Sequence, residues 1–161
     1  MHGATPAITE LLAAGVPFTE RAYSHDPRAS SYGMEAAAAL GRDPDQVFKT
    51  LIVAGDRGGR DYAVGIIPVS TTVDLKKLAK AMKTKRLTLA PVADAERISG
   101  YVAGGISPLG QRRRLPTIID ESAKQWGTIL VSGGRRGRDI ELSPFDLAGL
   151  SGARFAPIAE R

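Results

Sequence analysis

The chain has 161 residues and a net charge of +5, with 43% hydrophobic and 24% charged residues, which is typical of one soluble globular domain spanning residues 1–161. It has no cysteine and only two histidines, which excludes disulfides, zinc–thiolate sites and a cysteine nucleophile, and we expect no metal site and no other cofactor. No apolar run is long enough to span a membrane and the first residues lack a secretory pattern, so we expect a cytoplasmic protein with no membrane partner.

The N-terminal part predicts two helices around one strand. In chain order, the predicted elements are a helix over 5–15, a strand over 17–25, a helix over 31–40 and a capped helical turn over 43–46. Thr5 is a suitable cap for the first helix, Pro6 occupies its first turn, and Gly15 ends it.

The central part predicts two apolar strands and one amphipathic helix. The strands cover residues 47–55 and 61–69 and are joined by a hairpin-like turn at residues 55–59. The helix is predicted over residues 74–86, because Leu75 begins an apolar stripe that recurs at i+3, i+4 and i+7 while the lysines lie off that stripe.

The C-terminal part predicts several short strands. In chain order, we expect a strand over 86–90, a helical turn over 93–98, strands over 116–120, 128–132 and 139–142, a short helix over 121–125, a turn over 133–138, a helix starting at 143–146 and a closing segment over 153–158. Strands and helices do not alternate regularly. The sequence therefore predicts an α/β (α+β) fold, with a mixed, barrel-like sheet flanked by helices.

The segment GGISPLGQRRRLP, residues 104–116, contains a candidate nucleophile, Ser107. A nucleophile elbow requires Gly-x-Ser-x-Gly, but Leu109 stands in place of the last glycine and Pro108 removes the amide that would serve an oxyanion hole. The two glycines have no Cβ atom, so their amides can approach a carbonyl or a phosphate closely. The alternative is a plain turn.

Two further polar residues lie in unusual contexts. Lys49 interrupts an apolar strand, so it either extends to the sheet edge or stabilises negative charge in a cleft. Asp139 opens a strand after the glycine-rich turn that begins at Ser132, and it is either a turn residue or a carboxylate that orients a lysine or a substrate amine.

Basic residues form three groups along the sequence, within 76–86, 112–114 and 135–138. Such groups are compatible both with contacts to a nucleic-acid backbone and with a solvated surface.

Five motifs together resemble one known family. These are YSHDP, DPDQVFKTLIV, VDLKKLAKAM, GGISPLGQRRRLPTIID and VSGGRRGRDIEL, which span essentially the whole chain in order. They resemble the YbaK/EbsC family of stand-alone Cys-tRNA(Pro) deacylases, which are relatives of the editing domain of bacterial prolyl-tRNA synthetases. The resemblance implies a barrel-like α/β domain and an aminoacyl-tRNA partner, with prolyl-tRNA synthetase as a further candidate partner.

The resemblance also implies roles for individual residues. The catalytic set that it implies is Tyr23, Lys49, Gly104, Gly105 and Asp139. The implied substrate-binding set is Tyr32, Thr50, Ser107, Pro108 and Ser132. The three basic groups would then contact tRNA through Lys76, Lys77, Lys80, Arg112, Arg113, Arg135 and Arg136, although the QRRRLP run is richer in arginine than in close relatives.

The mechanism that the resemblance implies needs no protein nucleophile. The cysteine thiol of the substrate attacks its own ester and leaves as a cyclic thiolactone, so the cleavage is of hydrolase or lyase type. Three alternatives stay open: activity on Cys-tRNA(Cys), editing of Ala-tRNA(Pro) or another small aminoacyl-tRNA, and a non-catalytic module that binds tRNA or a synthetase.

Overall fold

The strands form two sheets. The computed structural model describes residues 4–56 and 61–160, and the turn predicted at 55–59 lies partly outside them. The antiparallel three-stranded sheet has the order β1 (Thr19–Ala22), β7 (Arg138–Leu142), β6 (Ile129–Arg135). The mixed five-stranded sheet has the order β4 (Leu87–Leu89), β2 (Phe48–Gly55), β3 (Tyr62–Pro68), β5 (Thr117–Asp120), β8 (Arg154–Ala156).

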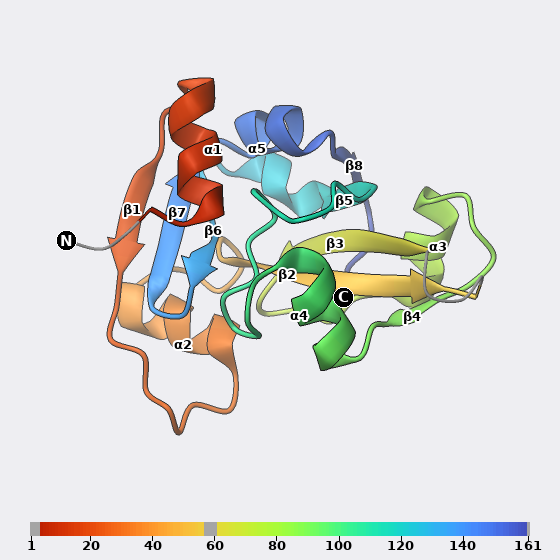
Figure 1. Cartoon of the computed structure of the whole chain (residues 1–161), viewed down its shortest axis with the longest axis horizontal. Helices are drawn as coiled ribbons and strands as arrows, with labels where there is room; N and C mark the ends of the chain where they lie inside the picture. Colours follow the sequence, from red (N-terminus) through yellow and green to blue (C-terminus); the bar gives the residue numbers. More distant parts are fainter. Residues whose placement is uncertain (1–3, 57–60, 161) are drawn as a thin grey trace.

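Five α-helices and one 3-10 helix in the described chain surround these sheets. They are α1 (Pro6–Ala14), α2 (Tyr32–Leu40), α3 (Leu75–Ala81), α4 (Val92–Ser99), η1 (Glu121–Gln125) and α5 (Pro144–Ser151). In Figure 1, α1 and α2 lie beside the three-stranded sheet, whereas α3 lies near the opposite end of the long axis, next to the five-stranded sheet. The predicted mixed α/β fold is confirmed.

The sheets do not close into the predicted barrel. They meet at a single parallel bridge between Val47 and Leu130, at the start of β2. β3 pairs along the length of β2, and β4 occupies its other edge at Val53–Gly55. β6 therefore finds a free edge only where β2 begins, and the two sheets splay apart instead of sharing a continuous ladder.

The core has two main parts, one on each face of the five-stranded sheet. Every residue of the central strand β3 is buried, because helices and loops cover both faces. On one face, α3 packs through Leu78 and Ala79. On the other, α1, α4 and the three-stranded sheet contribute a larger cluster that includes Leu11 and Ile98. No helix of the described chain is long and apolar enough to cross a membrane.

Helix α3 ends five residues before its predicted boundary at Arg86. Lys83 adopts a left-handed backbone, with φ +57°, and its N–H donates to the carbonyl of Lys80. The N–H of Thr84 reaches back to the carbonyl of Ala79, which completes a Schellman motif. Glycine normally marks this position, and a lysine there gives no signal in the sequence.

Three other element boundaries differ from their predicted positions. β1 is shorter than the strand predicted over 17–25, whereas α4 is longer than the turn predicted over 93–98. β6 runs through the predicted turn to Arg135, with a register shift after Ser132 that accommodates its two glycines.

Candidate functional site

A cavity of about 340 Å³ lies where the two sheets meet α2. Its size falls in the range of roughly 300–1,000 Å³ that is usual for small-molecule sites. It is lined by Tyr23, Ser30, Ser31, Tyr32, Gly33, Ala36, Val47, Phe48, Lys49, Thr50, Leu51, Ala103, Gly104, Ile106, Ser132 and Asp139. Seven of the ten residues expected to carry catalysis or bind the substrate are therefore brought together.

Lys49 and Thr50 enter the cavity from the start of β2. Burial lowers the pKa of the Lys49 ammonium group. No carboxylate in the described part of the chain pairs with this ammonium, so its charge is available to a ligand. The Oγ1 atom of Thr50 is buried and has no hydrogen-bond partner among the described residues. The strand thus presents two unsatisfied polar groups in succession.

Asp139 lies on β7 directly opposite Ser132 of β6. The residue is 5% exposed, and burial raises the pKa of its carboxyl group from 3.8 to about 7. The Oγ of Ser132 accepts the N–H of Gly134 at 3.1 Å, which fixes this turn beside the cavity. A buried carboxylate with a raised pKa can hold a proton or a cationic ligand near neutral pH.

Tyr23 lies beside Asp139 in the cavity wall. Its backbone N–H donates to the carbonyl of Gly137 at 2.9 Å, which holds the segment after β1 against the β6–β7 turn. Burial and then the charge of Asp139 raise the pKa of the phenol to about 12. The hydroxyl therefore remains protonated at neutral pH and can act as a hydrogen-bond donor.

Three separate segments meet at the rim of the cavity through Tyr32, Gly104 and Arg136. Gly104 has φ +83°, and a Cβ atom built on it would lie 2.7 Å from the Tyr32 ring. The guanidinium of Arg136 lies 4.9 Å from the centre of the same ring, and its Nε donates to the carbonyl of Ala103 at 2.7 Å. A glycine is required here because both the backbone angle and the aromatic contact leave no room for a side chain.

The substitution Gly104→Ala tests this packing. We expect it to lower the activity that the sequence resemblance implies by at least about tenfold, because the left-handed angle costs roughly 1–2 kcal/mol and Tyr32 must also move. Gly127→Ala is the matched control, since its Cβ would meet nothing within 4 Å and its φ is not positive. Comparing kcat/KM and Tm of the two variants checks the prediction. Equal activity of both variants would contradict it.

Gly105 does not line the cavity, although it follows Gly104 directly in the sequence. Its N–H donates to the carbonyl of Val102 at 2.8 Å, so this amide is not available to a substrate carbonyl. A Cβ atom on Gly105 would lie 3.0 Å from the backbone of Arg135. The residue is therefore a glycine because two backbone segments pass close together.

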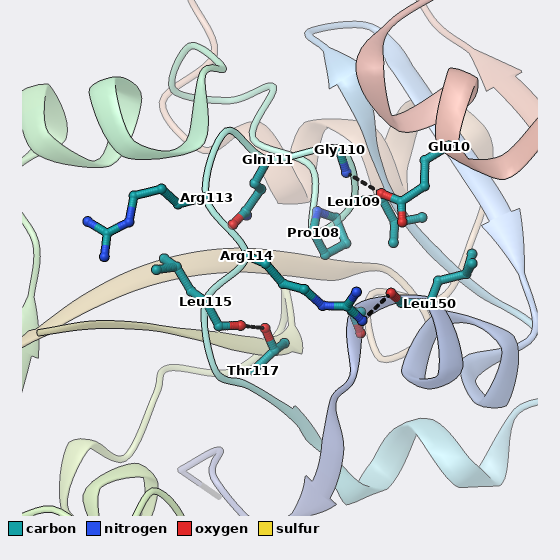
Figure 2. Close-up of a pocket in the computed structure, with 11 residues that line it drawn as sticks. Glu10, Pro108, Leu109, Gly110, Gln111, Arg113, Arg114, Leu115, Thr117 and Leu150 are labelled. Carbon is teal, nitrogen blue, oxygen red and sulfur yellow. Dashed lines mark hydrogen bonds between the residues drawn. The ribbon is translucent and has the colours of Figure 1, made fainter. Parts of the chain in front are cut away.

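Ser107 and Pro108, which were expected to bind the substrate, also lie outside the cavity. Ser107 is fully buried, and its Oγ accepts the N–H of Leu109 at 3.3 Å. Its carbonyl accepts from the side chain of Gln111 at 2.9 Å. Pro108 faces a separate, smaller hollow of about 90 Å³ (Figure 2). These residues shape the loop, because only its beginning, up to Ile106, reaches the cavity.

Replacing Ser107 with alanine is expected to leave kcat/KM unchanged. The variant should lose about 1 kcal/mol of stability, because the Leu109 N–H loses its buried acceptor. A kinetic assay of the activity that the resemblance implies and chemical denaturation measure the two quantities. If the folded variant loses activity beyond what its lower stability explains, Ser107 contributes to substrate binding or catalysis.

The three consecutive arginines have different environments. Arg112 packs beside Gly100, which ends α4. Arg114 donates to the carbonyl of Leu150 at 2.8 Å, in the last turn of α5. In Figure 2, Arg113 extends away from these contacts, and no described residue pairs with its guanidinium. Arg114 thus stabilises the C-terminal end of α5, where positive charge is favourable, whereas Arg112 only packs beside the end of α4.

The basic side chains of α3 do not line the cavity. Lys76, Lys77 and Lys80 are exposed on a helix at the far end of the molecule from α2 (Figure 1). Arg135 and Arg136 are exposed at the β6–β7 turn, and Arg136 reaches the rim. Of the α3 lysines and the arginines at the β6–β7 turn, only the arginines therefore adjoin the cavity.

His25 and Glu35 support the cavity and were not assigned a role from sequence. The Nδ1 atom of His25 lies 2.9 Å from a Glu35 oxygen, and the His25 ring is 5.9 Å from that of Tyr32. Glu35 also accepts the N–H of Asp26, which lowers the pKa of its carboxyl group. The spacing of ten residues between His25 and Glu35 matches no periodic pattern, so only the fold reveals the pair.

The cavity contains hydroxyl groups but no activated nucleophile. Among the described residues no histidine contacts the hydroxyl of Ser132 or Thr50, and the hydrogen bond of His25 is made to Glu35 through Nδ1. No group of three histidine, aspartate or glutamate side chains in the described ranges is placed to hold a metal ion. The arrangement instead offers a cation, a carboxylate and polar donors around a small apolar space, which suits positioning and charge stabilisation.

Comparisons with known proteins agree with this geometry. Residues 26–150 match the model of the aminoacyl-tRNA editing domain. A protein of Enterococcus faecalis (strain ATCC 700802 / V583), named "Putative Cys-tRNA(Pro)/Cys-tRNA(Cys) deacylase EbsC", is 37% identical over 148 residues, covering 91% of this chain and 87% of that protein.

Solved structures show the same fold. A "putative trans-editing enzyme for prolyl tRNA synthetase" superposes with a TM-score of 0.78 at 22% identity, covering 99% of this chain and all of that one. A structure described only as a hypothetical protein superposes with a TM-score of 0.85 at 24% identity, covering 97% of this chain and all of that one. The resemblance found in the sequence is confirmed, and the chain belongs to the aminoacyl-tRNA editing domain family.

Proposed function

We propose that this protein is a trans-editing deacylase that clears cysteine from mischarged Cys-tRNA(Pro), with residues 1–161 acting as one editing domain. Family membership supports the reaction class, and the name of the Enterococcus faecalis relative supports the substrate. Aminoacyl-tRNA is then the partner, and prolyl-tRNA synthetase is a second partner that would deliver the substrate.

The proposed reaction uses the substrate's own thiol. The cysteine sulfur attacks the ester carbonyl, a C–S bond forms, and the bond from the carbonyl carbon to the ribose oxygen breaks. The proton from the thiol ends on the ribose hydroxyl of the released tRNA, and the cysteine leaves as a cyclic thiolactone. The protein then supplies orientation and charge stabilisation only.

The cavity residues fit these requirements. The Lys49 ammonium would stabilise the developing oxyanion or hold the terminal nucleotide, and the Gly104 N–H would donate to the ester carbonyl. The Asp139 carboxylate would orient the substrate ammonium, while Tyr23 and Tyr32 limit the side-chain pocket. Thr50 and Ser132 complete the polar wall.

The observation that carries this proposal is a cavity with an unpaired cation and a buried carboxylate but no activated nucleophile. The test is a deacylation assay with tRNA charged with Cys, Ala or Ser, together with Cys-tRNA whose thiol is methylated. Release from Cys-tRNA alone, lost on methylation, supports thiol attack.

Other outcomes of this assay separate the alternatives. Equal release from the methylated substrate would replace thiol attack by water attack, and release from Ala-tRNA(Pro) would assign a different editing substrate. Comparing tRNA(Pro) with tRNA(Cys) tests whether the tRNA body is discriminated. Tight tRNA binding without release from any substrate would indicate a binding module.

Salt dependence tests the proposed tRNA contacts. We expect log KM to rise with log salt, and each phosphate contact removed should lower that slope by about 1. Two variants are informative: Arg113→Gln combined with Arg135→Gln, and Lys76→Gln, Lys77→Gln and Lys80→Gln combined. An unchanged slope in either variant would show that the substituted side chains lie on a solvated surface and do not contact tRNA phosphates.

A further inference from the structure

The rim of the cavity contains a tight turn whose central peptide is hydrogen-bonded by an arginine from another segment of the chain. Residues Val102–Gly105 form a four-residue turn closed by the bond from the Gly105 N–H to the Val102 carbonyl. The positive φ of Gly104, with no positive φ at Ala103, matches a type II turn. In such a turn the central peptide, between Ala103 and Gly104, makes no bond within the turn.

The carbonyl and the N–H of this central peptide are therefore both free to bond with groups outside the turn. Its carbonyl, on Ala103, accepts the Arg136 Nε at 2.7 Å. Its N–H, on Gly104, has no acceptor among the described residues, and both Ala103 and Gly104 line the cavity. The peptide is trans, because the described chain contains no cis bond, so the carbonyl and the N–H point in opposite directions.

We infer that Arg136 is a positioning residue that orients and polarises the Gly104 N–H through the Ala103–Gly104 peptide. A guanidinium donating to the carbonyl draws electron density from the amide, which makes the N–H at the other end a stronger donor. The same bond fixes the rotation of the peptide plane, so the donor is aimed before a substrate arrives. Preorganised donors of this kind stabilise a developing oxyanion.

Tyr32 holds Arg136 in the required position. The guanidinium lies 4.9 Å from the centre of its ring, and that ring in turn packs against Gly104. The arginine is thus fixed by a hydrogen bond and by an aromatic face. Arg136 is exposed, but these two contacts orient its guanidinium toward the turn.

The inference rests on the proposed function, because only that function supplies an ester carbonyl to which the Gly104 N–H would donate. Its test measures kcat and KM separately for Arg136→Gln and Arg136→Lys on Cys-tRNA(Pro). We expect Arg136→Gln to lower kcat on the order of tenfold, less than the loss of a whole oxyanion donor. KM and its salt dependence should change little, and Arg136→Lys should recover part of the loss. Arg97→Gln removes the same charge from an exposed site on α4 and should change neither constant.

A second readout does not depend on activity. In ¹H–¹⁵N spectra, Arg136→Gln should move the Gly104 amide resonance, whereas Arg97→Gln should not. A rise in KM that disappears at high salt, with kcat unchanged, would make Arg136 a phosphate contact and overturn the inference. An unmoved Gly104 resonance would overturn it as well. A wild-type protein that releases no amino acid would instead refute the proposed function, while the spectra still test the peptide geometry.

Discussion

Lys49→Met is expected to abolish measurable deacylation of Cys-tRNA(Pro), a loss of at least about 10³-fold in kcat/KM. The ammonium group is partly buried in an apolar strand context, and burial already lowers its pKa. Its charge is poorly screened there, so it interacts strongly with an oxyanion or a phosphate of the substrate. Methionine keeps a similar side-chain volume and an unbranched shape, and it removes the charge and the hydrogen-bond donors of the ammonium group.

The stability of this variant separates loss of function from unfolding. Because no described carboxylate pairs with Lys49, removing its ammonium also removes a desolvation cost, and the Tm should be equal to or higher than that of the wild type. Single-turnover deacylation and thermal unfolding measure the two effects. Near-normal turnover by a folded Lys49→Met protein would refute the role of this lysine.

Asp139→Asn is expected to lower kcat/KM by about 100-fold at pH 8, because losing one partner of a buried charge pair costs roughly 2–5 kcal/mol. In the wild type, the carboxyl pKa is about 7, so binding of the substrate ammonium should strengthen as pH rises through this value. We therefore expect kcat/KM to rise about tenfold per pH unit below 7 and to level off above it. In Asp139→Asn this rise should disappear, and its persistence would assign the titration to another group.

The same carboxyl group should affect stability in the opposite direction. Its pKa is raised by folding from 3.8 to about 7, so between these values the folded state binds a proton that the unfolded state has lost. Stability therefore falls as pH rises from 4 to 7, by at most about 4 kcal/mol. Asp139→Asn should be more stable than the wild type at pH 8 and nearly equal to it at pH 4. Urea unfolding at both pH values checks this, and a less stable variant at pH 8 would contradict the cause assigned to the raised pKa.

Many local features followed from the sequence because local chemistry determines them. Thr5 caps the first helix and Gly15 ends it as predicted, and the last helix begins within the predicted segment 143–146, with Ser143 as its cap. The end of α3 was missed, because Lys83 occupies a position that glycine usually marks.

The candidate site divides in a similar way. Lys49, Asp139 and Gly104 were identified from motifs, and the fold places all three on one cavity. Ser107 and Pro108 belong to the same motif but lie outside the cavity, because the chain turns away from it after Ile106. A motif reports which residues occur together, whereas the direction of each side chain depends on turns that long-range packing fixes.

The sequence by itself determined the absence of a thiol nucleophile, the positions of most helices and strands, and the family. These depend on composition, on periodicity and on residue types at fixed spacing. Only the tertiary structure decided that the sheets stay open, that the Gly105 amide is occupied, and that Arg136 meets the peptide before Gly104. The open sheets and the Arg136 contact join segments distant in sequence and follow from how the two sheets and α2 pack together, which no local pattern encodes. The Gly105 amide is occupied within its own four-residue turn, whose conformation the residue types alone left open.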